Sequence, residues 1–443
     1  MFLRLTSASL LLCFGCGGND VHHLPDGPPN GDGSVVVDGP PDGTPHGLVS
    51  MTVFDQAGTG AVDVGVPVVF INPDGTLVAT VATDSTGKAS ADVMPGASVT
   101  VVQANTSTNN TVLQTVLGAQ PGDNLRIGVE VPGTAVGAFT VNFTPIAGVV
   151  NSYSVIGPCF PPAPATGGTA TLMMFANCKL DTMDIVVIAT SAAGVPLGFL
   201  EQTGVAFVAG GSTTIPAAAL QPMATFNATY SNLPVEVTGV GLTRLVPDGF
   251  GLAASTNMTP TGTTLALSVL GAQPATALVR NLFQGPGRAR QQLFQNLAGN
   301  VTTYGVDAST TLLPWLGTVT MDVTTGIVTE PVSSAGTTGD TPDLAVLQVA
   351  YNRPAAVATT TFRWLVFGPD AGNFTLPTMP AEVGAVNPSA GDVVSSASNF
   401  IIESDSVANY DAIRATPYKL LLQIPGQRID GTKLRVGQTP PAP

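Results

Sequence analysis

The 443-residue chain is long enough for about two to four domains, and 44% of its residues are hydrophobic, so it can bury a core. Charged residues make up only 10%, while Gly (50) and Pro (37) are abundant, which is typical of many short strands joined by turns. The net charge of −14 argues against a nucleic-acid partner, because phosphate backbones are bound by clustered Lys and Arg.

An export signal is predicted at residues 1–15. Arg4 precedes the apolar stretch Leu10–Phe14, which is too short to span a membrane, and a small residue stands before Cys16. The segment resembles a bacterial lipoprotein precursor, although Cys13 stands where that family usually has Leu. The resemblance implies lipidation of Cys16 and, because Gly17 is not Asp, an outer-membrane anchor facing the periplasm or the cell surface. Plain secretion is the alternative.

Residues 16–46 are predicted to form a disordered tether. Pro, Gly and Asp fill most positions of this segment, so it cannot bury apolar area. Its spacing does not fit a calcium loop, and we interpret it as a spacer.

A first β-domain is predicted at residues 47–133. Its apolar runs are separated at 8–12-residue spacing by turn signals such as Asn72–Gly75, which favours a sandwich. The segments Gly65–Val68, Thr83–Lys88 and Met94–Gly96 resemble carboxypeptidase-regulatory-like and bacterial Ig-like domains. That resemblance implies a β-sandwich that acts as a non-catalytic spacer or contact module.

Two further domains are predicted from an internal repeat. Val116–Pro121 recurs as Val269–Pro274, and the pattern of Ala147–Val155 recurs in Ala298–Val306. We therefore expect related β-domains at 134–286 and 287–437, followed by a tail at 438–443. A strand is expected at 235–237 and a single short helix at 288–297. The fold class is thus all-β, with tandem β-sandwich domains of the Ig-like or transthyretin-like kind.

Two cysteines remain once the signal and the anchor are set aside. Cys159 and Cys178 form an even pair in an exported chain, which favours a disulfide that closes a Pro- and Gly-rich loop. A metal site is the weaker reading, because two thiolates supply only half of a tetrahedral site.

The body of the chain lacks the residues of common catalytic sites. All three histidines (His22, His23, His46) precede it, which excludes Ser-His-Asp and Cys-His catalysis there. Ser85–Lys88 fits the S-x-x-K pattern, but Gly87 and the flanking strands favour a β-turn. We therefore expect no enzymatic activity, no catalytic residue, no metal and no cofactor.

Carboxylate pairs and tryptophans leave alternatives open. The pairs Asp181/Asp184, Asp340/Asp343 and Glu403/Asp405 could serve acid–base catalysis or bind calcium, although most such pairs are merely solvated. Trp364 lies in an alternating strand and is expected in the core. Trp315 is a weak candidate for an exposed sugar-stacking platform.

The sequence thus predicts a lipid-anchored surface protein that acts as a non-enzymatic structural, adhesive or ligand-contact module for an unidentified protein or glycan. The first alternative is a glycan- or peptide-binding protein that uses loops of the two C-terminal β-domains. The second is a hydrolase built on a carboxylate pair.

Overall fold

The computed structural model describes most of the chain beyond residue 45. The predicted signal and all of the tether except residue 46 lie outside the described residues, so both stay predictions. The described ranges are 46–55, 60–105, 109–128, 135–146, 152–157, 163–165, 167–175, 181–193, 195–245, 252–258, 264–270, 276–285, 287, 289–298, 301–329, 332–333, 342–355, 358–369, 373–421 and 433–440.

The first seven strands form a sandwich of two sheets. One sheet has the order β4-β1-β7, and the strands of the other run β3-β2-β5-β6. In β4, burial alternates along the strand, so that Ala89, Ala91 and Val93 face the core between the sheets. The strands are β1 (Gly47–Val53), β2 (Pro67–Ile71), β3 (Leu77–Ala82), β4 (Lys88–Val93), β5 (Ala97–Asn105), β6 (Asn110–Ala119) and β7 (Asn124–Ile127).

The same strand order recurs in the next fourteen strands. The second sandwich comprises β8 (Ala135–Phe143), β9 (Ser152–Ile156), β10 (Ala163–Ala165), β11 (Thr169–Phe175), β12 (Thr182–Thr190), β13 (Pro196–Ala206) and β14 (Ser212–Ile215). The third comprises β15 (Met223–Ser231), β16 (Gly239–Leu245), β17 (Leu252–Met258), β18 (Thr264–Leu270), β19 (Thr276–Gln284), β20 (Arg290–Ala298) and β21 (Thr303–Asp307).

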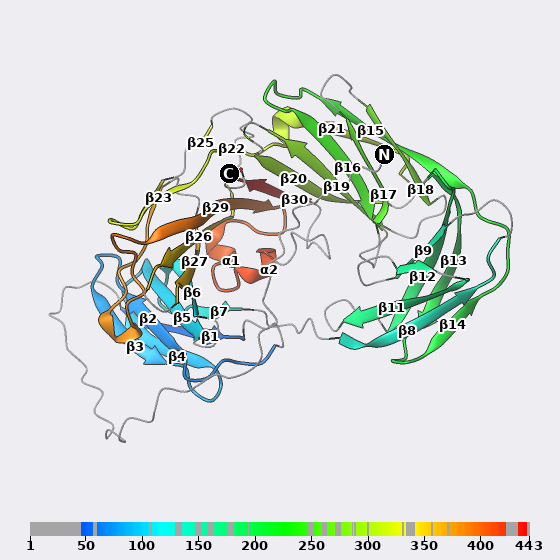
Figure 1. Ribbon diagram of the computed structural model, residues 1–443. Coiled ribbons are helices and arrows are strands. Elements are labelled where there is room, and N and C mark those ends of the chain that lie inside the picture. Colours follow the sequence, from blue (N-terminus) through cyan, green and yellow to red (C-terminus); the bar gives the residue numbers. More distant parts are fainter. Residues whose placement is uncertain are drawn as a thin grey trace.

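In all three sandwiches the first strand pairs antiparallel with the fourth and parallel with the seventh. The remaining strands follow the order third, second, fifth, sixth in each unit. The prediction of an all-β chain built from tandem β-sandwiches is therefore confirmed. Figure 1 shows the three units following one another around an arc.

The strand order divides the chain differently from the sequence repeat. Val116 lies on the sixth strand of its sandwich, whereas Val269 lies on a fourth strand. Tyr153 lies on a second strand and Tyr304 on a seventh. The expected boundary at 286/287 falls within the β19–β20 hairpin of the third sandwich. The matched segments are therefore not equivalent positions of the observed units.

Two local expectations were wrong. Residues 290–298 form strand β20 instead of a helix, because β19 and β30 (Lys433–Gln438) supply hydrogen-bonding partners on both of its edges. Residues 235–236 form a turn, in which Val237 N donates to Pro234 O and Val235 is exposed.

The rest of the chain forms a fourth part that closes the molecule. Its strands are β22 (Trp315–Leu316), β23 (Thr320–Asp322), β24 (Ile327–Thr329), β25 (Val332–Ser333), β26 (Leu344–Arg353), β27 (Thr360–Gly368), β28 (Asn373–Thr375), β29 (Val393–Ser404) and β30 (Lys433–Gln438), with helices α1 (Tyr410–Ile413) and α2 (Tyr418–Leu421). Two single 3₁₀ turns, η2 (Ala308–Thr310) and η3 (Ala381–Val383), complete the described elements.

This closing part joins the first sandwich to the third in one twelve-stranded sheet. Its strands β30-β29-β26-β27 lie between β20, the sixth strand of the third sandwich, and β6, the sixth strand of the first. β27 pairs parallel with β6, and β30 pairs antiparallel with β20. One edge of each of these two sandwiches, at β6 and at β20, is thus covered, so neither strand is open to pairing with other chains.

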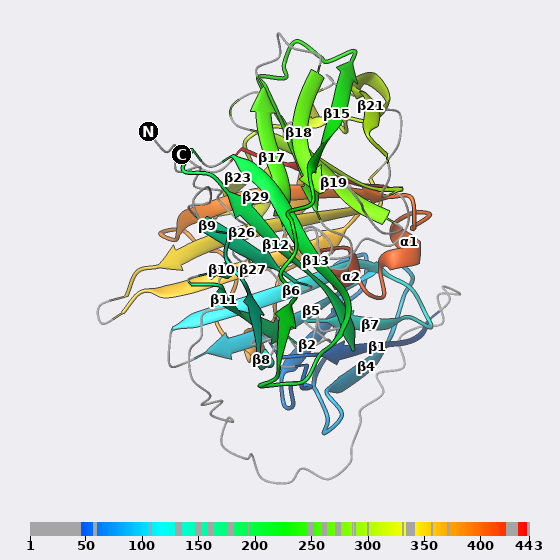
Figure 2. The ribbon, with the colours of Figure 1, turned by 90° about the vertical axis from the view of Figure 1, so that its right-hand side faces the viewer.

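The second sandwich stays outside that sheet, as Figures 1 and 2 show. Its sixth strand, β13, carries a single bridge to described residues at the corresponding edge, between Phe199 and Gln221. A β-bulge lies further along this strand, where Gly204 N donates to the Asp184 carboxylate at 2.9 Å. Bulges interrupt ladder pairing, so this edge is also protected.

The helical segment 409–421, which we call the strap, packs against the first sandwich. Arg414 forms an ion pair with Asp123 at 2.7 Å, and the Tyr410 hydroxyl donates to Leu117 O at 2.7 Å. In return, Arg126 N donates to Ala415 O at 2.8 Å. The strap is thereby fixed to the β6–β7 region of the first sandwich. None of the described helices is long and apolar enough to cross a membrane.

Candidate functional site: the pinned loop between β28 and β29

The connection from β28 to β29 spans residues 376–392 and contains only the short turn η3. Connections of this length without strands are uncommon and often carry function. Pro377, Pro380 and Pro388 lack backbone donors, and Gly384 has a φ of 89°, so this segment cannot join a regular ladder. Side chains from β26 and from the loop itself fix its shape instead.

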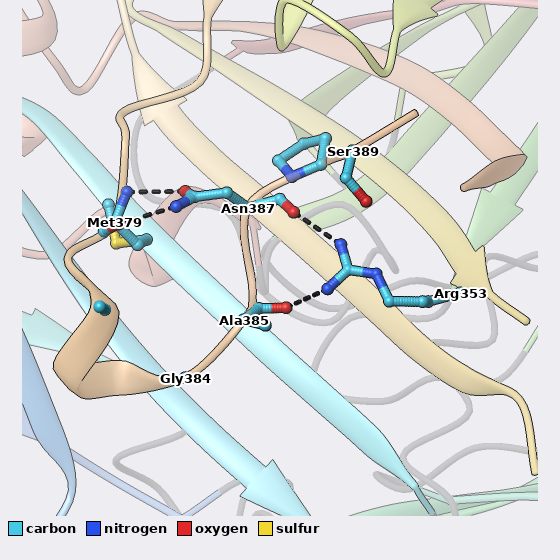
Figure 3. A pocket seen from close by; sticks show the side chains of 8 residues that line it. Arg353, Met379, Gly384, Ala385, Asn387 and Ser389 are labelled. Carbon is cyan, nitrogen blue, oxygen red and sulfur yellow. Dashed lines mark hydrogen bonds between the residues drawn. The ribbon is translucent and has the colours of Figure 1, made fainter. Parts of the chain in front are cut away.

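Arg353, at the end of β26, holds the loop from one side. Its Nε and one terminal nitrogen bind both carboxylate oxygens of Asp392, at 2.8 and 2.7 Å. Its terminal nitrogens also donate to the carbonyls of Asn387, at 2.6 Å, and Ala385. The guanidinium lies over the Phe362 ring, 4.8 Å from its centroid. Figure 3 shows its contacts with the two carbonyls.

Further side chains complete the hold on the loop. The Asn387 amide accepts from Met379 N and donates to Met379 O, both at 2.7 Å, which fastens the two limbs of the loop together. The Tyr351 hydroxyl donates to Val386 O, and Ser389 N donates to the Asp392 carboxylate at 2.9 Å. The loop is therefore preformed on the rigid sheet beneath it.

A pocket of about 580 Å³ opens on the surface of this loop. Arg353 forms one wall, and loop residues form the others (Figure 3). The lining residues are Arg353, Met379, Ala381, Gly384, Ala385, Asn387, Pro388 and Ser389. The volume lies within the range of small-molecule sites, and the depression is largely open to solvent.

The two charged groups beside the pocket neutralise each other. The hydrogen bond from Arg353 lowers the pKa of Asp392, and the same contact raises the pKa of Arg353. Both groups are thus held in their charged forms and are hydrogen-bonded to each other. They are poorly suited to proton transfer and well suited to keeping the loop in place.

The carboxylate pairs singled out in the sequence are largely engaged in structural contacts. The Asp184 carboxylate accepts from Gly204 N. Asp343 accepts from Ser404 N at 2.8 Å, while Asp340 lies outside the described residues. The Glu403 carboxylate is bonded to Arg435, and burial raises its pKa. Among the described residues, no three His, Cys, Asp or Glu side chains gather as a metal would require.

The structure places the remaining candidates as follows. Trp315 is 1% exposed and packs in the core of the third sandwich, so its ring offers no face for stacking a sugar. Trp364 is fully buried, as expected. Ser85, Thr86 and Gly87 lie in a β-turn that begins at Asp84 and is closed by Gly87 N donating to Asp84 O, also as expected. Cys16, Cys159 and Cys178 lie outside the described residues.

The sequence reasoning missed the loop and Arg353. A usable signal was present, because residues 376–392 hold several Pro and Gly and no long apolar run. No pattern in the sequence indicates that Arg353 reaches this loop, since Asp392 lies 39 residues further along the chain.

Comparisons with known proteins give no family. No protein-family model matches the chain, and no curated protein matches it. Among solved structures, the TIE protein of Bacillus anthracis aligns at 11% identity and a TM-score of 0.15, over 59% of this chain and 50% of that one. A candidate adhesin from Bacteroides ovatus aligns at 10% identity and a TM-score of 0.14, over 60% and 88%. The chain thus spans about half the length of the first, and TM-scores this low do not identify a shared fold.

Proposed function

We propose that the protein is a membrane-anchored, non-enzymatic contact module of the cell envelope, which presents the loop 376–392 to a partner at the cell surface. One observation carries the proposal: a long loop is pinned by several side chains onto a rigid sheet, with a pocket on its surface. Loops that carry function are typically positioned by a rigid scaffold in this way.

The ionisable groups around the pocket support a role in contact over one in catalysis. Arg353 and Asp392 are bonded to each other and to loop backbone atoms, so neither is available as a general acid or base. Breaking this pair would also release the loop. Their arrangement is the one expected of a fixed contact surface.

The proposed lipid anchor is inferred from the sequence alone. Cys16, after a short apolar stretch, is the proposed lipidation site, and the Pro- and Gly-rich residues after it would hold the sandwiches away from the membrane. Cys159 and Cys178 are proposed to form a disulfide in this exported compartment.

Two measurements test the proposal. Intact-mass spectrometry of protein extracted from membranes should give a lipidated chain that begins at Cys16 and gains two protons on reduction. Protein lacking the lipid should bind whole envelopes, and replacing residues 381–389 by a Gly-Ser segment of equal length should abolish that binding. An unlipidated chain would overturn the proposed anchor. Binding that is unaffected by the replacement would overturn the proposed role of the loop.

A further inference from the structure

The loop pocket has the chemistry of a small-molecule site, and its hydrogen-bonding groups narrow the class of ligand. Resting on the contact function proposed above, we infer that it binds a neutral saccharide unit. Charge, hydrogen-bonding capacity and shape each contribute to the inference.

The charged groups around the pocket argue against an ionic ligand, whether anionic or cationic. Arg353 is its only basic lining residue, and Asp392 holds that guanidinium through two hydrogen bonds. An anionic ligand would have to compete with this carboxylate. A cationic ligand would be repelled by the positive charge of the Arg353 guanidinium, which lines the pocket. A neutral ligand meets neither penalty.

The pocket offers more hydrogen-bond acceptors than donors. A guanidinium has five N–H donors, and four bonds from Arg353 to described residues are present, which leaves one donor on the nitrogen that contacts Ala385. The carbonyls of Ala385 and Asn387 each receive one bond from Arg353 and keep a second lone pair. A fitting ligand therefore offers several donors and at least one acceptor within a small volume.

Saccharide hydroxyl groups meet this requirement, because each both donates and accepts and several surround one ring. Ala381, Ala385 and Pro388 provide the apolar surface that would lie against the C–H groups of the ring. An extended peptide presents its donors along one line, at about 3.3 Å per residue, and matches a compact, open pocket of this size less well. The pinned loop needs no rearrangement, which lowers the entropic cost of binding.

The test uses the full mature chain and an array of neutral and acidic glycans, followed by calorimetric titration of the neutral saccharides that bind. Ala381→Leu fills the pocket from an exposed position without touching the bonds of Arg353, and should weaken binding at least tenfold. Ala390→Leu adds the same side chain at an exposed loop residue outside the lining, and should leave binding unchanged.

Equal binding by wild type and Ala381→Leu would overturn the inference. It also fails if the chain binds only acidic glycans or no glycan at all. The contact function has a separate readout: if envelope binding is lost on loop replacement while neutral saccharides do not bind, the contact function stands and the saccharide assignment fails. Circular dichroism of each variant establishes that it is folded.

Discussion

The indole Nε1 of Trp364 on β27 donates to the hydroxyl of Thr115 on β6 at 2.8 Å, although 249 residues separate them. The Thr115 hydroxyl also lies 2.8 Å from that of Thr100, and all three side chains are fully buried. Buried polar groups need partners, so this chain of hydrogen bonds fixes the register at which the closing part meets the first sandwich.

Removing that donor should destabilise the fold. We expect Trp364→Phe to lower the free energy of unfolding by about 1–3 kcal/mol more than Trp315→Phe, as measured by urea denaturation. Both changes remove the same atoms from a buried site, but Nε1 of Trp315 has no acceptor among the described residues. Equal losses in the two variants would contradict a role for the hydrogen bond.

The close packing of Trp315 against the β19–β20 hairpin predicts intolerance at Gly285. A Cβ atom there would overlap the six-membered ring of Trp315. Gly285→Ala should therefore cost about 1–3 kcal/mol through overpacking. Gly305→Ala is the matched control, because the nearest atom to a Cβ at that position is a Thr229 side-chain oxygen 3.7 Å away. Thermal denaturation of both variants decides the matter, and similar melting temperatures would refute the packing argument.

From the contacts of the strap we expect a substitution near the C-terminus to change hydrogen exchange in the first sandwich. Arg414→Gln removes the ion pair with Asp123 and should loosen the segment that accepts a hydrogen bond from Arg126 N. Hydrogen exchange at the Arg126 amide should then become faster, while the Val141 amide in the second sandwich keeps its rate. Unchanged exchange at Arg126 would show that the strap is held without this pair.

The Arg353–Asp392 pair predicts acid sensitivity. The pKa of Asp392 is lowered in the folded state, so its contribution to stability is fully present above about pH 4, the ordinary Asp value, and is lost as the pH falls through the lower folded value. Urea midpoints measured between pH 2 and 7 should therefore fall less steeply in acid for Asp392→Asn than for wild type. Asp92→Asn, a change at an exposed strand position, should retain the wild-type slope.

Much of the fold follows from local patterns. The alternation in Lys88–Val93 and the turn signal at Asn72–Gly75 gave a strand and a turn that the structure contains, since Gly75 N donates to Asn72 O. The helix expected at 288–297 was wrong because the polar and apolar side chains of this segment fit a helix as well as a strand. Only the pairing of β20 with β19 and β30 decides between the two.

The site was harder to predict than the fold. Trp315 follows Pro314, which made exposure plausible, but its burial depends on Gly285 in a distant hairpin. Arg353 acquires its role only when the chain returns at Asn387 and Asp392. Contacts of this kind depend on tertiary structure, which local periodicity does not encode.

The position of β27 beside β6 has a consequence for biosynthesis. A ribosome makes the first sandwich long before the strand that covers its edge, so during translation β6 has no β27 to pair with. An unpaired edge invites association with other nascent chains. We therefore expect the unfinished chain to depend on chaperones that shield this strand until its C-terminal half arrives.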